Sequence, residues 1–363
     1  SGAFKGKFDR VVIAEVDDKL KKAVNSTGEV SINIAAADRV YPETYTGIEV
    51  FNPTNETDLE QLVAVAAEAD ELATALPSVN FFKHVTPWLK KGFAMTPGKR
   101  RFIYTAENNN HAAEELAALL GDEFPETYCL NTVVGKMSGV ITAAECAERN
   151  MKPLSPDADR GHLVEEFNKI LISSAPGIEN RLTQGLIVKP DLYPFEEAKL
   201  YGHNAIHFML GTFGKQRGLE LMSELRDHVD LICDAFSAFV DESGRALCCK
   251  YNNFDPLFTK TGFREYAVDL LVRMTNPFLR DAIDRITRDL PRKLSWNDRV
   301  IGTMRVVMSQ GVEPNIIAKA AALAAREEFG STREAVTAGL LALWGDVDSE
   351  ESQALINYIV EYI

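Results

Sequence analysis

Residues 11–20 read Val11-Val12-Ile13-Ala14-Glu15-Val16-Asp17-Asp18-Lys19-Leu20, an apolar run between charges that predicts a buried strand leading directly into a helix. The runs at 72–76 and 102–106 follow the same pattern, and an Ala- and Leu-rich helical segment over 112–120 follows the second of them. Strands that alternate with helices pair in parallel through crossover helices. The first part of the chain is therefore predicted to be an α/β domain built on a doubly wound sheet.

After residue 190 the sequence changes to long helical patterns with few strand signals. We therefore expect two domains, an α/β domain over residues 1–188 and a mainly α-helical domain over residues 189–363. Thr57 and Glu60 have the spacing of a capping box in the first domain, and one short strand is expected near 247–251 in the second. The predicted helices of the second domain are 195–213, 215–240, 263–273, 277–289, 295–309, 315–329, 332–344 and 349–362.

The composition is that of a globular protein, because 46% of the 363 residues are hydrophobic and 25% are charged. The net charge of −14 argues against a nucleic-acid partner. No apolar run approaches the ~18 residues of a membrane span, and no signal peptide is recognisable. The five cysteines lack metal-binding spacing and the histidines are scattered. We expect a cytoplasmic protein without a metal site or a membrane partner.

Glu15 stands at the end of the first predicted strand. In dinucleotide-binding folds, an acid in this place hydrogen-bonds the adenosine ribose and repels a 2′-phosphate, which favours NAD over NADP. A surface acid at a strand end gives the same pattern. The G-x-G-x-x-G loop expected about 20 residues before such an acid does not occur in the sequence. We therefore expect that the natural first strand and glycine loop are missing, with poor NAD binding as the consequence, or that the fold differs.

Residues 199–207 read Lys199-Leu200-Tyr201-Gly202-His203-Asn204-Ala205-Ile206-His207. An α-helix would place Lys199, Asn204 and His207 at about 0°, 140° and 80° around its axis, with His207 leaning back toward Lys199. An ammonium that donates a proton to a forming alkoxide, beside an amide and an imidazole that stabilise negative charge, suits carbonyl reduction. The oxidative direction requires a neutral Lys199, whose pKa burial would lower. A solvated helix with a satisfied histidine is the alternative.

The spacing Lys-x(4)-Asn-x(2)-His resembles the catalytic helix of the polyol-specific long-chain dehydrogenase (mannitol dehydrogenase) family. A second block from Arg273 through Asn276-Pro277 to Asp281 is similar to the family's R-F-x-N-P-x-(I/L)-x-D, and it continues through Arg292-Lys293 to Asp298-Arg299. Glu107-Asn108 resembles the family's (D/E)-N, and Glu15 stands where its ribose-binding acid belongs. The resemblance extends from the second strand of the family's fold to near the end of the chain.

This resemblance implies an N-terminal Rossmann domain, a helical C-terminal domain and an active site between them. The implied reaction is reversible hydride transfer between NAD and a small polyol. Chain length and residues 292–299 are most similar to the sugar-phosphate branch, which interconverts mannitol 1-phosphate and fructose 6-phosphate. The implied roles are general acid/base for Lys199, carbonyl polarisation for Asn204 and Asn108, substrate orientation for His207, cofactor binding for Glu15, and substrate binding for Arg273, Lys136 and Lys293.

Several alternatives stay open at this stage. Arg273 fits an ion pair within the helical domain as well as a substrate contact, and Lys293 fits a structural role as well as a phosphate contact. Gly135 departs from the family, which has an acid there. The chain also fits a same-family dehydrogenase for a free polyol or hexuronate, or a non-catalytic relative that lacks the cofactor loop. The sequence does not predict an oligomeric state.

Overall fold

The strand predicted over residues 11–14 is present as β1 (Val11–Ala14), which pairs in parallel with β4 (Ile48–Phe51) in a two-stranded sheet. The ladder continues past β1, because the N–H of Glu15 donates a hydrogen bond to the carbonyl of Phe51 at 3.0 Å. Asp17 then caps α1 (Asp18–Thr27) by accepting hydrogen bonds from two N–H groups of its first turn. The strand and the helix that follows it are thus joined by three residues, of which Glu15 and Asp17 carry acidic side chains in defined places.

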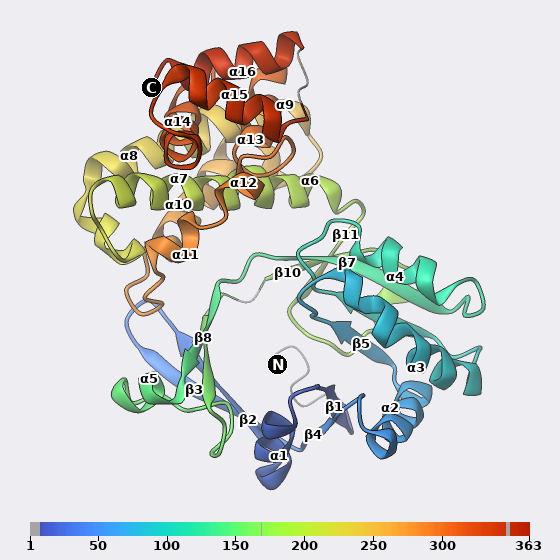
Figure 1. The fold of residues 1–363 in the computed structure, drawn as a ribbon. Helices are drawn as coiled ribbons and strands as arrows, with labels where there is room; N and C mark the ends of the chain where they lie inside the picture. Colours follow the sequence, from blue (N-terminus) through green and yellow to red (C-terminus); the bar gives the residue numbers. More distant parts are fainter. Residues whose placement is uncertain (1–7, 168, 346–348) are drawn as a thin grey trace. The chain divides into compact units, whose positions relative to one another are not determined.

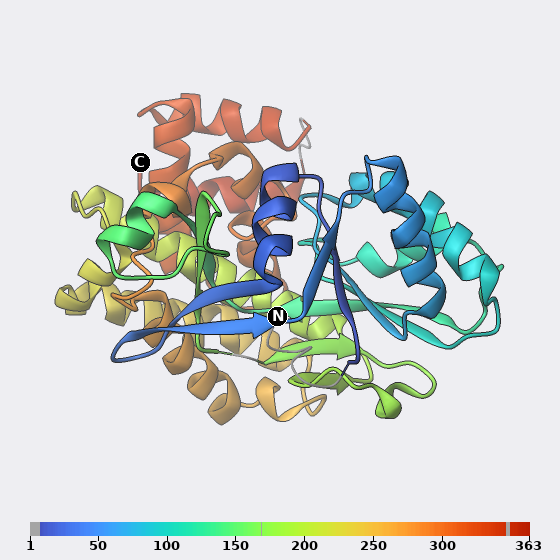
Figure 2. The same cartoon turned by 90° about the horizontal axis from the view of Figure 1, so that it is seen from below.

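The structure is a computed structural model that describes residues 8–167, 169–345 and 349–363 (Figure 1). It divides into two compact units, Ser1–Tyr193 and Pro194–Ile363. Strands, drawn blue to green, lie in the first unit, and the yellow to red second unit is helical (Figures 1 and 2). The predicted fold class, an α/β Rossmann-like part followed by a mainly helical part, is confirmed.

The runs predicted at 72–76 and 102–106 are neighbouring parallel strands of a five-stranded sheet with the order β11-β10-β7-β6-β5. β5, β6 and β7 are parallel, whereas β10 runs antiparallel to β7 and parallel to β11. The carboxyl ends of the three parallel strands therefore meet at one edge of the sheet. The strands are β5 (Glu71–Thr74), β6 (Arg101–Thr105), β7 (Thr127–Val134), β10 (Ile170–Ser173) and β11 (Leu186–Lys189).

A four-stranded sheet with the order β3-β2-β9-β8 was not predicted. Its inner strands β2 and β9 are parallel, and each pairs with an antiparallel outer strand. Polar residues interrupt these strands, as in the VYPETYT of β3, so no apolar run marks them. The prediction of one doubly wound sheet is wrong in this respect, because the described strands form three sheets. The elements are β2 (Glu29–Ala35), β3 (Val40–Thr46), β8 (Ser138–Thr142), β9 (Arg160–Glu165) and α5 (Ala143–Glu148).

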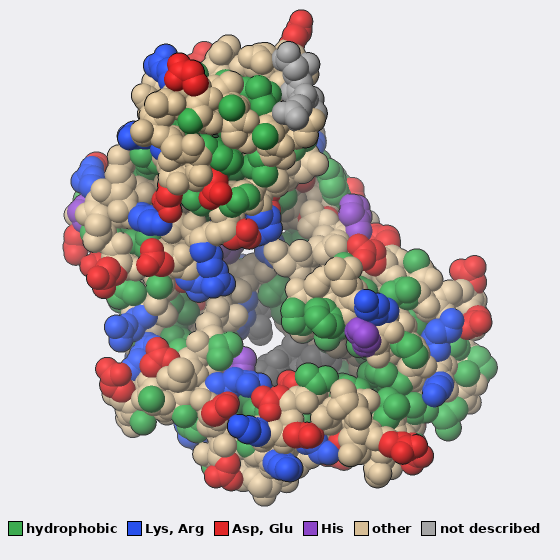
Figure 3. All heavy atoms as spheres, in the orientation of Figure 1, with side chains coloured by type: hydrophobic (Ala, Val, Ile, Leu, Met, Phe, Trp, Pro, Cys, Tyr) green, Lys and Arg blue, Asp and Glu red, His purple; other side chains and the backbone are tan. Residues whose placement is uncertain are grey.

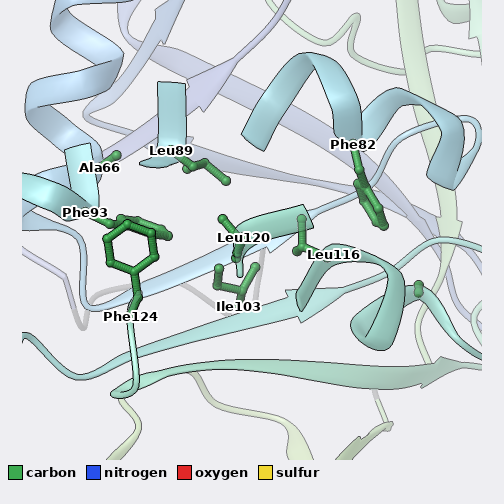
Figure 4. Close-up of a cluster of buried hydrophobic side chains, with 9 residues drawn as sticks. Ala66, Phe82, Leu89, Phe93, Ile103, Leu116, Leu120 and Phe124 are labelled. Carbon is green, nitrogen blue, oxygen red and sulfur yellow. The ribbon is translucent and has the colours of Figure 1, made fainter. Parts of the chain in front are cut away.

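Three helices cover β6: α2 (Glu56–Glu68), α3 (Phe82–Met95), which follows η2 (Val79–Phe81), and α4 (Ala112–Leu120). Their apolar side chains form one buried cluster with the strand (Figure 4). The capping box predicted at Thr57 is wrong, because Asn55 caps α2 through the N–H of Asp58. The buried cluster contains Ala66, Phe82, Leu89, Phe93, Ile103, Ala112, Leu116, Leu120 and Phe124.

The second unit is built from short helices, two of which, η4 and η6, have the wider π-helical repeat. The elements are α6 (Tyr193–Glu197), η4 (Ala198–Asn204), α7 (Ala205–Gln216), η5 (Met222–Asp227), α8 (Val229–Ser237), η6 (Ala238–Gly244), α9 (Arg245–Lys250), η7 (Pro256–Phe258), α10 (Lys260–Met274), α11 (Ile283–Thr287), α12 (Leu290–Lys293), α13 (Ile301–Ser309), α14 (Asn315–Phe329), α15 (Arg333–Leu343) and α16 (Glu350–Val360). The first unit also contains the short η3 (Ile178–Asn180).

Several predictions for the second unit are wrong, and the helix predicted over 295–309 begins only at Ile301. The helix predicted over 215–240 breaks after residue 216, and the strand predicted near 247–251 is instead the helix α9. The helix predicted over 277–289 is reduced to α11, because Asn276 makes a turn before Pro277 by accepting a hydrogen bond from the N–H of Phe278 at 2.9 Å. Side-chain turns of this kind compete with the helix that the apolar spacing alone predicts.

Charged side chains of both signs are interspersed over the face drawn in Figure 3, red acidic groups beside blue basic groups. Many charged side chains of the described residues pair, as Arg10 does with Glu49 and Lys215 with Glu327. Such exposed pairs contribute little to stability, typically about 0–1 kcal/mol each. The packing of the apolar clusters, rather than surface charge, therefore holds each unit together.

Candidate active site

The segment predicted to carry the chemistry lies on a helix whose middle is π-helical. α6, η4 and α7 follow one another without a break, so the continuous α-helix predicted over 195–213 is wrong for residues 198–204. A π-helix bonds residue i to residue i+5, which is the spacing from Lys199 to Asn204. These two residues are therefore about one turn apart on the helix, instead of about 140° apart as in an α-helix.

Lys199, Asn204 and His207 all remain partly exposed on this helix. All three are half-buried, whereas the neighbouring side chains of Ala205 and Phe208 are buried, at 4% and 1% exposure. The helix thus keeps its apolar side in the core of the unit and leaves an amine, an amide and an imidazole within reach of a small molecule.

The pKa of Lys199 lies below its ordinary value of 10.5. Burial is the main cause, and the positive charge of Arg299 adds to it, whereas Glu196 acts in the opposite direction. Glu197 is engaged elsewhere, since its carboxylate accepts hydrogen bonds from Lys250 at 2.7 Å and Tyr251 at 2.6 Å. A lysine in this environment gives up its proton more readily than an exposed lysine, as a general base requires.

His207 faces a buried carboxylate. Its Nε2 lies 3.2 Å from Oδ2 of Asp281, at ion-pair distance but without the alignment of a hydrogen bond. The other oxygen of Asp281 accepts hydrogen bonds from Nε of Arg285 at 2.8 Å and from its Nη2 at 2.5 Å. Burial raises the pKa of Asp281, but His207 and Arg285 outweigh that effect and hold the pKa below its usual value. The carboxylate is therefore ionised beside the imidazole.

A second imidazole, His203, lies behind the first and was not predicted as a site residue. The ring centroids of His203 and His207 are 6.0 Å apart, and His203 is only 5% exposed. Burial, followed by the charges of His207 and Arg273, lowers the pKa of His203 well below its ordinary value, so the ring is neutral. Its Nδ1 is buried and lacks a hydrogen-bond partner among the described residues.

The two other predicted residues of this unit differ in their surroundings. The side chain of Arg273 is 12% exposed, and its Nη1 lies 3.1 Å from Oδ2 of Asp269. Lys293 is 4% exposed, and its ammonium donates hydrogen bonds to the carbonyls of Ile286, at 2.8 Å, and Arg288. Burial lowers the pKa of Lys293 to about 8. Its contacts favour a structural role over a substrate contact, and its substrate role stays a prediction.

Glu15, Asn108 and Lys136 belong to the first unit. Glu15 is half-buried at the carboxyl end of β1, where Oε1 accepts a hydrogen bond from the N–H of Asp17 at 2.9 Å. Asn108 is exposed beyond the carboxyl end of β6. The preceding Glu107 is buried and joins β6 to β5 by accepting hydrogen bonds from Thr74 and from the N–H of Leu76, both at 2.9 Å. Lys136 is half-buried between β7 and β8.

The sequence analysis predicted no role for three residues of this site, which are Asp281, Arg299 and His203. The i, i+4 spacing of Asp281 and Arg285 is a signal that pointed to a helical ion pair. Arg299 and Lys199 are about 100 residues apart in the sequence, so no local pattern predicts that the charge of Arg299 acts on Lys199. His203 lies within the segment itself, where its burial, at 5% exposure, depends on the elements packed around it.

Neither a metal site nor a membrane span emerges from the described residues. No group of three His, Cys, Asp or Glu side chains in them is arranged to hold a metal ion. None of their helices is both long enough and apolar enough to cross a membrane. The cytoplasmic location expected from the sequence stays a prediction.

Several known proteins are similar to this one over most of its length. It is 27% identical to a mannitol-1-phosphate 5-dehydrogenase of Bacillus licheniformis, with 90% of this chain and 83% of the relative covered. The enzyme of the same name from Bacillus subtilis is 26% identical with the same coverage. That from Aspergillus fumigatus is 24% identical, with 83% and 75% covered.

Two solved structures share the fold. The mannitol 2-dehydrogenase of Pseudomonas fluorescens, solved as a ternary complex with NAD and D-mannitol, has a TM-score of 0.68 at 15% identity and covers 95% of this chain and 82% of its own. A substrate-free D-sorbitol dehydrogenase has a TM-score of 0.71 at 14% identity, with 97% and 86% covered. Residues 191–344 match the family described as mannitol dehydrogenase C-terminal domain. The helical unit is therefore similar to the C-terminal domain of mannitol dehydrogenases, and the chain as a whole is similar to the mannitol-1-phosphate 5-dehydrogenases.

Proposed function

We propose that this protein is an NAD-dependent polyol dehydrogenase that interconverts mannitol 1-phosphate and fructose 6-phosphate. The observation that carries the proposal is the half-buried Lys199, with its lowered pKa, on the same continuous helix as the partly exposed Asn204 and His207. The preference for a phosphorylated substrate is supported by the relatives from Bacillus and Aspergillus, all of which are mannitol-1-phosphate 5-dehydrogenases.

The first unit offers residues that suit some parts of NAD but not others. Glu15 offers a half-buried carboxylate at the carboxyl end of a parallel strand, which suits the hydroxyl groups of an adenosine ribose. The carboxyl ends of β5 and β6 meet at one edge, where Asn108 is exposed. The sequence contains no G-x-G-x-x-G loop, so we assign no residue to the pyrophosphate. Bound NAD would supply the acceptor for the hydride that leaves the carbinol carbon.

Lys199 is proposed as the general acid/base. In the oxidative direction, its neutral amine takes the proton of the substrate hydroxyl as the C–H electron pair leaves the same carbon. In the reductive direction, its ammonium returns that proton to the forming alkoxide. The amide of Asn204 donates a hydrogen bond to the reacting oxygen, and His207 orients the substrate. Asn108 is proposed to assist Asn204 at the same oxygen.

The basic residues are proposed for the rest of the substrate. Arg273 and Lys136 are assigned to its distal hydroxyls or its phosphate, since an arginine fork matches phosphate oxygens well. Lys293 has less support, because its ammonium already donates two of three hydrogen bonds to backbone carbonyls. The phosphate contact of Lys293 is therefore retained only as a minor part of the proposal.

A substrate panel tests the proposal. The full gene product is incubated with NADH and, in separate reactions, fructose 6-phosphate, fructose and hexuronates, and NADH consumption is followed. Fructose 6-phosphate is expected to be the preferred substrate by kcat/KM. Preference for an unphosphorylated ketose or a hexuronate would reject the sugar-phosphate assignment and retain the dehydrogenase. Failure to bind NADH would reject the dehydrogenase itself and favour a non-catalytic relative.

A further inference from the structure

The π segment of the candidate catalytic helix packs against the second π segment, η6. Glycine makes this approach possible, because a Cβ on Gly202 would lie 2.9 Å from Cε2 of Phe239, which is fully buried. On η6, a Cβ on Gly244 would lie 2.6 Å from the carbonyl oxygen of Phe239 and 2.6 Å from Cδ1 of Phe263. The contact at Gly202 is the one that joins the two segments, so glycine there permits the close approach of η4 to Phe239 of η6, whereas Gly244 is crowded by η6 itself and by Phe263 of α10.

A hydrogen bond joins the end of η6 to the middle of η4. The hydroxyl of Ser243 donates to the carbonyl oxygen of Tyr201 at 2.8 Å. Ser243 is 1% exposed, so water does not replace this bond. Thr303 also lies 3.4 Å from the same carbonyl, but its single hydroxyl proton has a closer acceptor, the carbonyl of Arg299 at 2.5 Å. Ser243 is therefore the stronger of the two side-chain donors to Tyr201.

The carbonyl of Tyr201 lies midway between Lys199 and Asn204. A π segment shifts the backbone ladder of an α-helix by one residue, and a buried carbonyl left out of the ladder needs another donor. Ser243 supplies a side-chain donor to the carbonyl of Tyr201, within the π segment, from 42 residues away. Without this hydrogen bond, an α-helical backbone over residues 198–204 becomes more favourable relative to the π-helical one. An α-helical backbone would place Asn204 about 140° from Lys199 around the helix axis.

We infer that Ser243 is a positioning residue, whose hydroxyl holds the π register of η4 and thereby keeps Lys199 and Asn204 on one side of the helix. The catalytic consequence rests on the proposed function, whereas the positioning itself does not. Ser243 acts through the backbone of Tyr201 and is not assigned a contact with the substrate.

The direct test measures the pKa of Lys199 without relying on activity. Wild type, S243A and the control T212V are acetylated at a series of pH values, and the labelling of Lys199 is quantified by mass spectrometry. Thr212 is a matched control, because its hydroxyl is also buried and donates to a carbonyl, that of Phe208 at 2.9 Å, within α7 itself. We expect the pKa of Lys199 in S243A to rise toward its ordinary value by about one unit, and T212V to match the wild type. Superimposable profiles for S243A and T212V would overturn the inference.

A second variant covers the case in which S243A does not fold. S243C keeps the volume of the side chain but replaces the hydroxyl by a weak thiol donor, so a smaller rise in the pKa of Lys199 is expected. An unchanged profile in a folded S243C, when S243A is unfolded, would overturn the inference.

Kinetics distinguish this inference from the proposed function. With fructose 6-phosphate and NADH, S243A is expected to lower kcat about tenfold or more with little change in KM for NADH, and T212V to remain normal. A fall in kcat without any change in the pKa of Lys199 would point to general loss of structure and contradict positioning. If the wild type reduces no ketose but the labelling shift occurs, the proposed function fails and the positioning role stands.

Discussion

His207 and Asp281 form a buried imidazole–carboxylate pair, with Nε2 of the histidine 3.2 Å from Oδ2 of the aspartate. Arg285 holds the carboxylate from the other side through two hydrogen bonds to Oδ1. Because Nε2 faces Asp281, Nδ1 is the ring nitrogen left to meet a substrate oxygen. The aspartate thus orients the imidazole, as a carboxylate behind a histidine does in other active sites.

Replacing this carboxylate by an amide is expected to impair catalysis. D281N removes the negative charge but keeps the size of the side chain, so the orientation of His207 is weakened. Losing the charge that faces the imidazole is expected to lower kcat/KM by roughly tenfold, which corresponds to about 1.4 kcal/mol. Steady-state kinetics with fructose 6-phosphate and NADH measure this effect. D284N removes the same charge from an exposed position in α11 and is expected to leave kcat/KM unchanged. Equal effects of the two variants would reject the orienting role.

Arg299 is expected to set the pH dependence of polyol oxidation. Oxidation requires neutral Lys199, so kcat rises with pH until the pKa of Lys199 is passed and then levels off. Burial, and then the positive charge of Arg299, keep that pKa below 10.5. R299Q removes the positive charge, so the pKa rises and the profile moves to higher pH, by about one unit.

The pH profile of kcat for mannitol 1-phosphate oxidation measures this shift. R326Q removes a positive charge from an exposed site on α14 and is expected to retain the wild-type profile. A profile that moves to lower pH in R299Q, or stays in place, would show that Arg299 does not act on the titrating group.

Glu242 is expected to make stability depend on pH. Its buried carboxylate accepts hydrogen bonds from the N–H groups of Ile316, at 2.7 Å, and Ile317, at 3.1 Å, at the start of α14. Burial raises the pKa of Glu242 to about 7, although these hydrogen bonds oppose the rise. The folded state therefore holds this proton more tightly than the unfolded state, whose carboxyl has a pKa of about 4.3. The contribution of Glu242 to the free energy of unfolding is thus greatest below about pH 4.3, falls between that pH and about 7, and is constant above it.

E242Q removes this titration. As the pH rises from 5 to 8, the free energy of unfolding of E242Q is expected to increase relative to that of the wild type. The increase is at most about 1.4 kcal/mol for each pH unit in the titrating range. Urea unfolding of both proteins at the two pH values measures the difference. E313Q, at an exposed position before α14, is the control and should follow the wild type. A difference between E242Q and the wild type that stays constant with pH would contradict the raised pKa.

The sequence predicted the elements that a local pattern defines. The apolar run of β1, the acid that follows it, and the polar residues Lys199, Asn204 and His207 all have local signals. The π register of η4 does not, because it depends on contacts with Phe239 and Ser243, about 40 residues further along the chain.

Other failures of prediction have the same physical origin. The strand β3 contains alternating polar and aromatic residues, and its stability comes from pairing with β2, so a search for apolar runs misses it. The sequence left Lys293 open between a phosphate contact and a structural role, because nothing local shows that the fold buries its ammonium against the carbonyls of Ile286 and Arg288. A linear sequence gives residue types, but burial and hydrogen-bond partners depend on distant segments.

The central claim is that the side chain of Lys199 transfers the proton. The most direct measurement compares the turnover of fructose 6-phosphate by the wild type and Lys199→Ala, together with NADH binding by fluorescence titration. We expect turnover to fall by roughly 10²–10⁴-fold, while the Kd for NADH stays within about twofold, because Lys199 lies outside the unit assigned to the cofactor. Near-normal turnover in Lys199→Ala would contradict the acid/base role.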